Sequence, residues 1–187
     1  MSEITREQVV DFLSNMPVIQ MADATNVLIV SPTLPVNNLR ELIAHAKANP
    51  GKVAYGTPGI ATVPHLGAEM LQMAAGIKLN HVPYKGAAPS TLAAMAGEVS
   101  MVITTTTAVL PQAKAGRLKI IAVTTLQRLP GLPDVRTVAE SGLPGYEAIS
   151  WFGLLAPKGT PPDVVQKIYR DVAQVLRDPD VQQKLQG

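Results

Sequence analysis

The sequence of 187 residues lacks cysteine, which excludes disulfides, zinc-thiolate centres, iron–sulfur clusters and cysteine nucleophiles. Aromatic residues make up only 4% of the chain and charged residues 16%. Lysine and arginine number 16 against 14 aspartate and glutamate, so the formal net charge is +2, and the basic residues are scattered along the chain. Nucleic-acid-binding proteins gather basic residues into a stripe. We therefore expect no nucleic-acid partner.

Long hydrophobic runs are missing as well. The apolar stretches at 27–30 and 118–123 have the length of β-strands and fall short of the roughly 20 residues that a membrane-spanning helix needs. The opening MSEITREQVVDFLSNMPVIQ carries acidic residues where a secretory signal has a basic patch and an unbroken apolar core, so we expect no export signal in this chain. With 47% apolar residues, the length fits one ordinary domain with a core.

Motifs of common catalytic sites are also missing. The chain contains no G-x-S-x-G nucleophile elbow, no H-E-x-x-H motif and no convincing pair of acids near a suspected cleft. His45 falls in a predicted helix and His81 in a predicted strand, without the spacing of metal ligands. We therefore expect no catalytic residue, no metal site and no cofactor.

Strand-like and helix-like segments alternate from Asn26 onward. The patterns predict strands at 27–30, 52–56, 77–84, 99–103, 118–125 and 149–157, and helices at 36–49, 65–75, 87–96, 108–115 and from Pro161 onward, with a further short helix at the end. A capping box at Thr5 predicts an amphipathic helix over 5–15. Strands that are apolar on both faces must be covered on both. The pattern therefore predicts an α/β fold with an open, mostly parallel sheet and helices on both faces.

The loop after the strand at 52–56 is the first candidate site, because ligands of such sheets bind at the carboxyl ends of the strands. Its glycines allow close backbone approach, and the amides of the following helix start attract an anion such as a carboxylate or phosphate. The threonine hydroxyls and the imidazole could serve the ligand or cap the helix, and an ordinary βα turn remains the alternative. The candidate residues are Gly56, Thr57, Pro58, Gly59, Thr62 and His65.

Two other strand ends carry polar side chains. Tyr84, Lys85 and Gly86 offer an aromatic hydroxyl and a cation just before a helix, although an exposed lysine beside a turn is usually solvated. Thr104 and Thr105 open a run of four threonines that could line a polar cleft or satisfy the amides of the next helix. Trp151 and Phe152 are expected to serve core or hinge packing.

Several ordered segments together resemble one protein family. LIAHAKANPGKVAYGTPG, HVPYKGAAPSTLAAMAGEV, AGRLKIIAVTT, LPDVRTVAESGLPGYE and SWFGLLAPKGTP closely resemble the tripartite tricarboxylate transporter receptors, the Bug or TctC extracytoplasmic solute-binding proteins, from about Asn26 to the end of the chain. The resemblance implies a two-lobed, type II periplasmic-binding-protein fold that closes over small carboxylates and delivers them to a membrane permease. It implies that the candidate residues from Gly56 to His65 form the ligand loop of the second lobe, together with the turn of Tyr84, Lys85 and Gly86.

The resemblance also predicts an organisation in parts. Residues 1–25 form an N-terminal helical extension unlike the family, 26–156 the ligand-binding lobe with two crossing strands, and 157–187 helices of an incomplete first lobe. Two local departures are Ala61, where the family usually has a further glycine, and Val63, where it has a small hydroxyl residue. The family often has an Asp-Asn pair where Thr104 and Thr105 stand. We expect a truncated receptor with half of the ligand cleft and correspondingly weak binding.

Three functions remain open from the sequence. The first is a solute-binding module for small carboxylates that works with permease subunits and is not an enzyme. The second is a doubly wound enzyme that binds a phosphorylated or carboxylate substrate at the same loop. The third is a remnant that self-associates through its N-terminal helix and uncovered strands. The resemblance implies a periplasmic location, whereas the expected lack of an export signal leaves a cytoplasmic one open.

Overall fold

The computed structural model describes residues 16–186, with side chains as far as residue 183. The predicted helix over 5–15 lies outside the described residues. The described residues divide into two compact units, one formed by residues 24–150 and the other by residues 16–23 together with 151–186. Among residues 16–186, no helix combines the length and the apolar character needed to cross a membrane.

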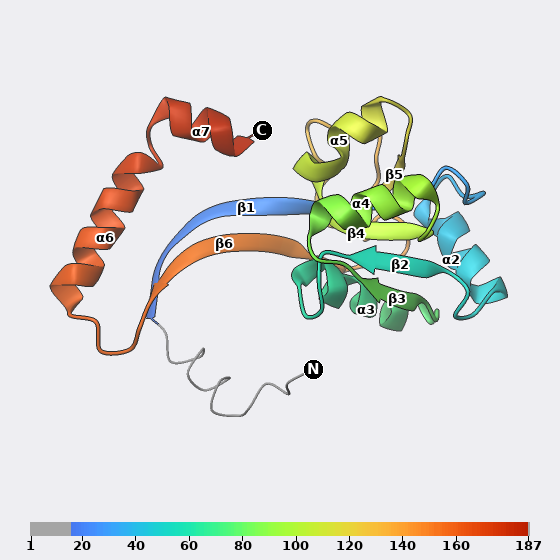
Figure 1. Ribbon diagram of the computed structural model, residues 1–187, viewed down its shortest axis with the longest axis horizontal. Coiled ribbons are helices and arrows are strands. Elements are labelled where there is room, and N and C mark those ends of the chain that lie inside the picture. The colour runs from blue at the N-terminus through green and yellow to red at the C-terminus, as the bar shows by residue number, and fades with distance from the viewer. Residues whose placement is uncertain (1–15, 187) are drawn as a thin grey trace. The chain divides into compact units, whose positions relative to one another are not determined.

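The unit of residues 24–150 is built on one sheet with strand order β3-β2-β4-β1-β5 (Figure 1). Its elements in chain order are the inner segment of the strand β1 (Met16–Val30), α2 Leu39–Ala48, β2 Ala54–Thr57, α3 Val63–Ala75, β3 Asn80–Pro83, α4 Ala87–Ala96, β4 Met101–Thr105, α5 Thr106–Lys114 and β5 Lys119–Val123. The alternation of strands and helices predicted from the sequence is confirmed.

Strand directions put three carboxyl ends at one edge of this sheet. β2 runs parallel to both β3 and β4, whereas β1 runs antiparallel to its neighbours β4 and β5. β3, β2, β4 and β5 therefore all point the same way, and the predicted open, mostly parallel sheet is confirmed. The segments after β2, β3 and β4 leave the sheet at the same edge.

Helices cover both faces of the sheet, as the apolar strands predicted. Along β1, Leu28 and Val30 pack on the face covered by α2 and α3, in a core that includes Leu42 and Leu71. Val27 and Ile29 point to the opposite face, where α4 and α5 supply Ala94 and Val109 among others. Because successive side chains of a strand point to opposite faces, all five residues from Asn26 to Val30 are buried.

Several boundaries differ from the predicted ones. β1 begins at Met16, whereas the sequence pattern placed the strand from Val27, so residues 16–25 continue the strand. α3 begins at Val63 because Thr62 is its N-cap and Pro64 occupies its first turn, a position at which proline is tolerated. β3 covers only Asn80–Pro83 of the stretch 77–84.

The described part of the other unit contains the outer segment of β1, most of β6 (Ile149–Ala156), α6 (Pro162–Val175) and α7 (Pro179–Gln186). The expectation that Trp151 and Phe152 pack in a core is wrong, because they are 57% and 53% exposed. α6 is amphipathic, yet no residue of 162–175 is buried, and the apolar Val164 and Val175 are exposed. The amphipathic pattern identified the helix correctly but could not show what would cover its apolar side.

Candidate functional site

The predicted site residues after β2 and β3 lie together because backbone hydrogen bonds join the two segments. β2 pairs with a parallel strand on each side. Thr57 is the partner of Pro83 in β3, and Gly56 is the partner of Val102 in β4. Beyond the ladder, the Tyr84 N–H donates to the Thr57 carbonyl at 3.0 Å and the Gly86 N–H donates to the Pro58 carbonyl at 2.8 Å. The loop after β2 and the turn after β3 therefore form one structural element.

Three helix N-termini open at this edge of the sheet. The N-cap residues of α3, α4 and α5 are Thr62, Gly86 and Thr105, and among residues 16–186 none of the three helices has a side-chain cap or an acidic residue in its first turn. The first N–H groups of a helix have no partner within the helix, and its N-terminus carries partial positive charge. By contrast, α2 is capped by the Asn38 side chain, which accepts from the Glu41 N–H at 3.0 Å.

Gly56 is required by the close approach of its neighbours. A Cβ at this position would lie 3.1 Å from Cγ2 of Val102 and 3.2 Å from Cε2 of Tyr84. The Tyr84 ring therefore packs directly over the end of β2, and its burial raises the pKa of the phenol. Gly86 is required for a different reason, since its φ of 121° lies in a region that side chains disfavour.

The hydroxyls of Thr57 and Thr62 form hydrogen bonds within the loop after β2. The buried Thr57 hydroxyl donates to the Gly59 carbonyl at 3.2 Å and lies 2.7 Å from Nε2 of His81. The Thr62 hydroxyl also donates to the Gly59 carbonyl, at 2.8 Å. At the end of β4, the Thr104 hydroxyl is buried and has no hydrogen-bond partner within residues 16–186, whereas Thr105 is partly exposed.

His65 turns back onto the loop that precedes α3. Its Nδ1 accepts from the Ala61 N–H at 3.1 Å, and Ala61 has a left-handed backbone with φ of 61°. The His65 ring stacks on the His81 ring with centroids 4.1 Å apart, and His81 stacks in turn on Tyr55 at 4.8 Å. The sequence pointed to His65 as a possible cap or ligand donor. The contact between His81 and His65 was not predicted, because the residue pattern of one strand does not show which side chains of a helix pack against it.

Glu69 contacts several polar side chains around the two stacked histidines. Glu69 accepts from the Tyr55 hydroxyl at 2.5 Å and from the Gln72 side-chain amide at 2.7 Å, and it lies 3.9 Å from Nε2 of His65. Burial lowers the pKa of His81, the neighbouring His65 lowers it further, and Glu69 acts in the opposite direction. Burial and the hydrogen bond to Glu69 raise the pKa of Tyr55. In the described part of the chain, no group of three or more His, Asp or Glu residues could hold a metal ion.

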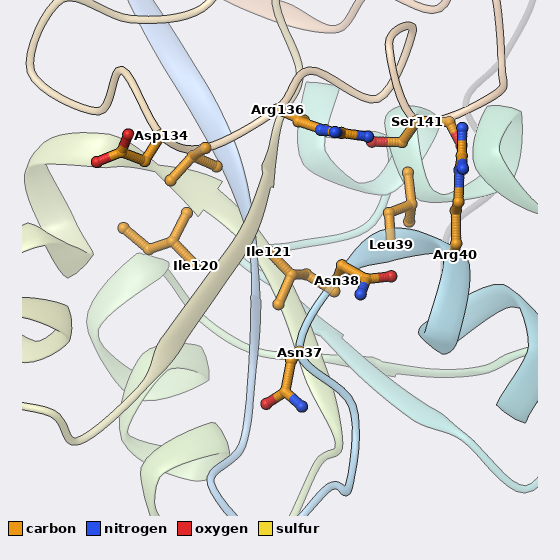
Figure 2. Close-up of a pocket in the computed structure, with 10 residues that line it drawn as sticks. Asn37, Asn38, Leu39, Arg40, Ile120, Ile121, Asp134, Arg136 and Ser141 are labelled. Carbon is orange, nitrogen blue, oxygen red and sulfur yellow. The ribbon is translucent and has the colours of Figure 1, made fainter.

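A pocket of about 440 Å³ lies elsewhere in this unit, between the start of α2, β5 and the connection after β5 (Figure 2). Figure 2 shows Arg40 and Ser141 on one side of it and Asp134 and Ile120 on the other. The Arg40 Nε donates to the Ser141 carbonyl at 3.3 Å. Because α2 follows antiparallel β1, this pocket is at the sheet edge opposite the three uncapped helices. None of the predicted ligand residues lines it.

The model of the tripartite tricarboxylate transporter family receptor matches residues 9–187. The chain belongs to this receptor family. The match includes residues before Asn26, where the resemblance of the quoted segments began. The mixed α/β fold with its open, mostly parallel sheet is similar to solved periplasmic binding proteins of the family.

Several relatives and solved structures are similar to this chain over most of its length. The protein BugT of Bordetella pertussis is 35% identical over 162 residues, which cover 87% of this chain and 50% of BugT. The structure titled R. palustris Rpa4515 with adipate is 36% identical with a TM-score of 0.82, and the match covers 91% of this chain and 57% of that one. MatC from Rhodopseudomonas palustris with bound malate is 26% identical with a TM-score of 0.83, covering 90% and 57%. The chain spans about half the length of the curated relatives it matches.

Proposed function

We propose that this chain binds a small carboxylate at the edge of the sheet where β2, β3 and β4 end, as part of a solute receptor of a tripartite tricarboxylate-type transporter. The observation that carries the proposal is the meeting of three uncapped helix N-termini at one edge, with no acidic first-turn residue in α3, α4 or α5 among the described residues. Backbone N–H groups and helix dipoles at such positions favour an anion.

The candidate residues divide into two roles in this proposal. One group shapes the loops through close packing, positive φ and internal hydrogen bonds: Gly56, Thr57, Pro58, Gly59 and Gly86. Thr104 is buried in β4, and its hydroxyl has no partner within residues 16–186. The other group is at least partly exposed beside the open N-termini and would contact the ligand: Thr62, Tyr84, Lys85 and Thr105. His65 is turned back onto the loop, where its Nδ1 accepts from the Ala61 N–H. The exposed Lys85 ammonium adds positive charge, which strengthens a hydrogen bond to a carboxylate.

The relatives support the ligand class. One solved relative is described with adipate and another with malate, and both compounds carry two carboxylates. Permease subunits as partners, a periplasmic location and a binding role without catalysis belong to the same proposal. They rest on the receptor family, which the chain matches over residues 9–187.

A negative charge introduced at the start of α5 tests the proposed carboxylate site directly. Thr105→Asp puts a favourable N-cap residue on α5, but its carboxylate would repel a carboxylate ligand from the same place. Thr105→Asn is the matched neutral control. We expect isothermal titration calorimetry with succinate, malate and citrate to detect binding by the 187-residue chain and the Asn variant. The Asp variant should bind at least about tenfold more weakly, equivalent to about 1.4 kcal/mol.

Three outcomes would contradict this proposal. The first is the absence of heat with every carboxylate, and the second is equal affinity of the Asp and Asn variants. The third is preferential binding of inorganic phosphate, which would favour the alternative of an enzyme with a phosphorylated substrate. Size-exclusion chromatography at high protein concentration separates the remaining alternative, since a remnant that only self-associates would form oligomers and bind no ligand.

A further inference from the structure

A stacked pair of histidines lies directly behind the loop that opens α3. His65, in the first turn of α3, and His81, in β3, have ring centroids 4.1 Å apart and planes inclined by 19°. Each ring holds a different part of the loop. Nε2 of His81 lies 2.7 Å from the Thr57 hydroxyl, and Nδ1 of His65 accepts the Ala61 N–H at 3.1 Å.

The bond from Ala61 to His65 constrains an unfavourable backbone. Ala61 is the only non-glycine residue with positive φ in the described part of the chain, at 61°. A residue with a Cβ adopts this conformation at a cost of order 1 kcal/mol, so it persists only where surrounding contacts enforce it. Ala61 immediately precedes Thr62, the N-cap of α3, so its conformation sets how the first N–H groups of α3 are presented.

Only the neutral imidazole can make this bond. Nδ1 accepts the Ala61 N–H while it carries no proton, which places the ring proton of neutral His65 on Nε2. A proton on Nδ1 would turn the acceptor into a donor that faces another donor. The His65–Ala61 contact therefore requires that Nδ1 carries no proton.

The surroundings of His65 and His81 favour protonation of at most one of the two imidazole rings. The titratable groups recorded against the two rings are Glu69 on α3, 3.9 Å from Nε2 of His65, and Tyr55 on β2, stacked on His81. Two imidazolium rings at 4.1 Å would repel each other. His81 resists protonation, because burial and the neighbouring His65 lower its pKa. Its contact with Thr57 is thus retained when the pH falls.

Building on the proposed carboxylate site, we infer that His65 is a positioning residue of that site. Neutral His65 fixes Ala61 in the left-handed turn from which α3 begins, and a proton on Nδ1 releases the turn and weakens carboxylate binding. His81 supports the His65 ring and holds Thr57 on the other side of the loop. A carboxylate should therefore bind more weakly to the form of the chain with a proton on Nδ1 of His65 than to the neutral form.

Four variants of the 187-residue chain test this role by titration with succinate at about pH 7.5 and about pH 5.5, on either side of the ordinary histidine range. In His65→Asn the amide oxygen replaces Nδ1 as an acceptor and does not titrate. His65→Ala removes the acceptor, and Ala61→Gly in the His65→Ala background removes the backbone strain. His45→Asn changes a histidine in α2, away from the loop, and is the matched control.

We expect the wild type and His45→Asn to lose about fivefold more affinity at the lower pH than His65→Asn does, the equivalent of one lost hydrogen bond of about 1 kcal/mol. The comparison with His65→Asn corrects for protonation of succinate itself. His65→Ala should bind weakly at both pH values, and the added Ala61→Gly should restore binding. Equal pH dependence in wild type and His65→Asn, or no rescue by Ala61→Gly, would overturn the inference.

A measurement without ligand separates this inference from the proposed function. Nitrogen chemical shifts of the imidazole rings report which nitrogen carries the proton. We expect neutral His65 as the Nε2–H form, with the Ala61 amide shifting as His65 titrates. If this signature is found but succinate never binds, the proposed function fails while the loop contact stands. If succinate binds and His65 carries its neutral proton on Nδ1, the inference fails alone.

Discussion

Thr104→Val should stabilise the fold. The Thr104 side chain is fully buried in β4, and its hydroxyl has no partner within residues 16–186. Leaving a buried polar group unpaired costs about 1–3 kcal/mol, whereas valine keeps nearly the same shape without the hydroxyl. We expect the free energy of unfolding to rise by about 1 kcal/mol, which raises the melting temperature of a chain of this size by about 2–4 °C.

Thr124→Val, at the position directly after β5, is the matched control. The Thr124 hydroxyl is equally buried, but it lies 2.9 Å from the Asn26 carbonyl and 2.7 Å from the Ala148 carbonyl. Removing this donor should destabilise the fold by about 1 kcal/mol. Urea unfolding followed by far-UV circular dichroism compares the two variants with wild type. If Thr104→Val lowers stability as Thr124→Val does, the Thr104 hydroxyl has a partner and the reasoning is refuted.

Two further predictions concern packing and alkaline pH. Gly56→Ala should destabilise the chain by about 1–3 kcal/mol in urea unfolding, because its Cβ would press on Val102 and Tyr84 at 3.1 and 3.2 Å; unchanged stability would show that the Tyr84 ring moves away easily. Burial raises the pKa of Tyr146, whose hydroxyl donates to the Gly67 carbonyl at 2.8 Å. The unfolded chain therefore loses this proton first, and stability should fall as the pH rises above about 10. Tyr146→Phe should make that fall shallower in unfolding curves measured across this pH range, and an identical slope would contradict the assignment.

Local patterns were enough to predict the layers of this fold. The alternation of apolar strands with helices that end at glycine predicted helices on both faces of a mostly parallel sheet. Gly76 and Gly97 occupy the C-caps of α3 and α4 in the left-handed conformation that glycine favours. The same rules placed the polar loops at the carboxyl edge, and backbone hydrogen bonds from Tyr84 and Gly86 bring two of them together.

Contacts between residues far apart in the chain could not be predicted from one sequence. His81 becomes a neighbour of Tyr55 through the register of β2 and β3, and of His65 through the packing of α3. The roles of hydroxyls were equally hidden, because a threonine in a loop donates to the nearest suitable carbonyl. Thr57 and Thr62 both donate to Gly59, which only the folded loop reveals. The start of β1 at Met16 was missed because residues 16–25 are only partly buried and alternate weakly.

The central place of β1 bears on how the chain acquires its structure during translation. Val30 pairs with Met101 on one side and with Lys119 on the other, so both partners leave the ribosome long after β1 itself. Contacts between residues far apart in sequence slow folding and prolong the exposure of apolar strands. The apolar segment Val27–Val30 therefore cannot complete its pairing until β5 has been synthesised, and it stays exposed for longer than strands that pair with near neighbours in the sequence.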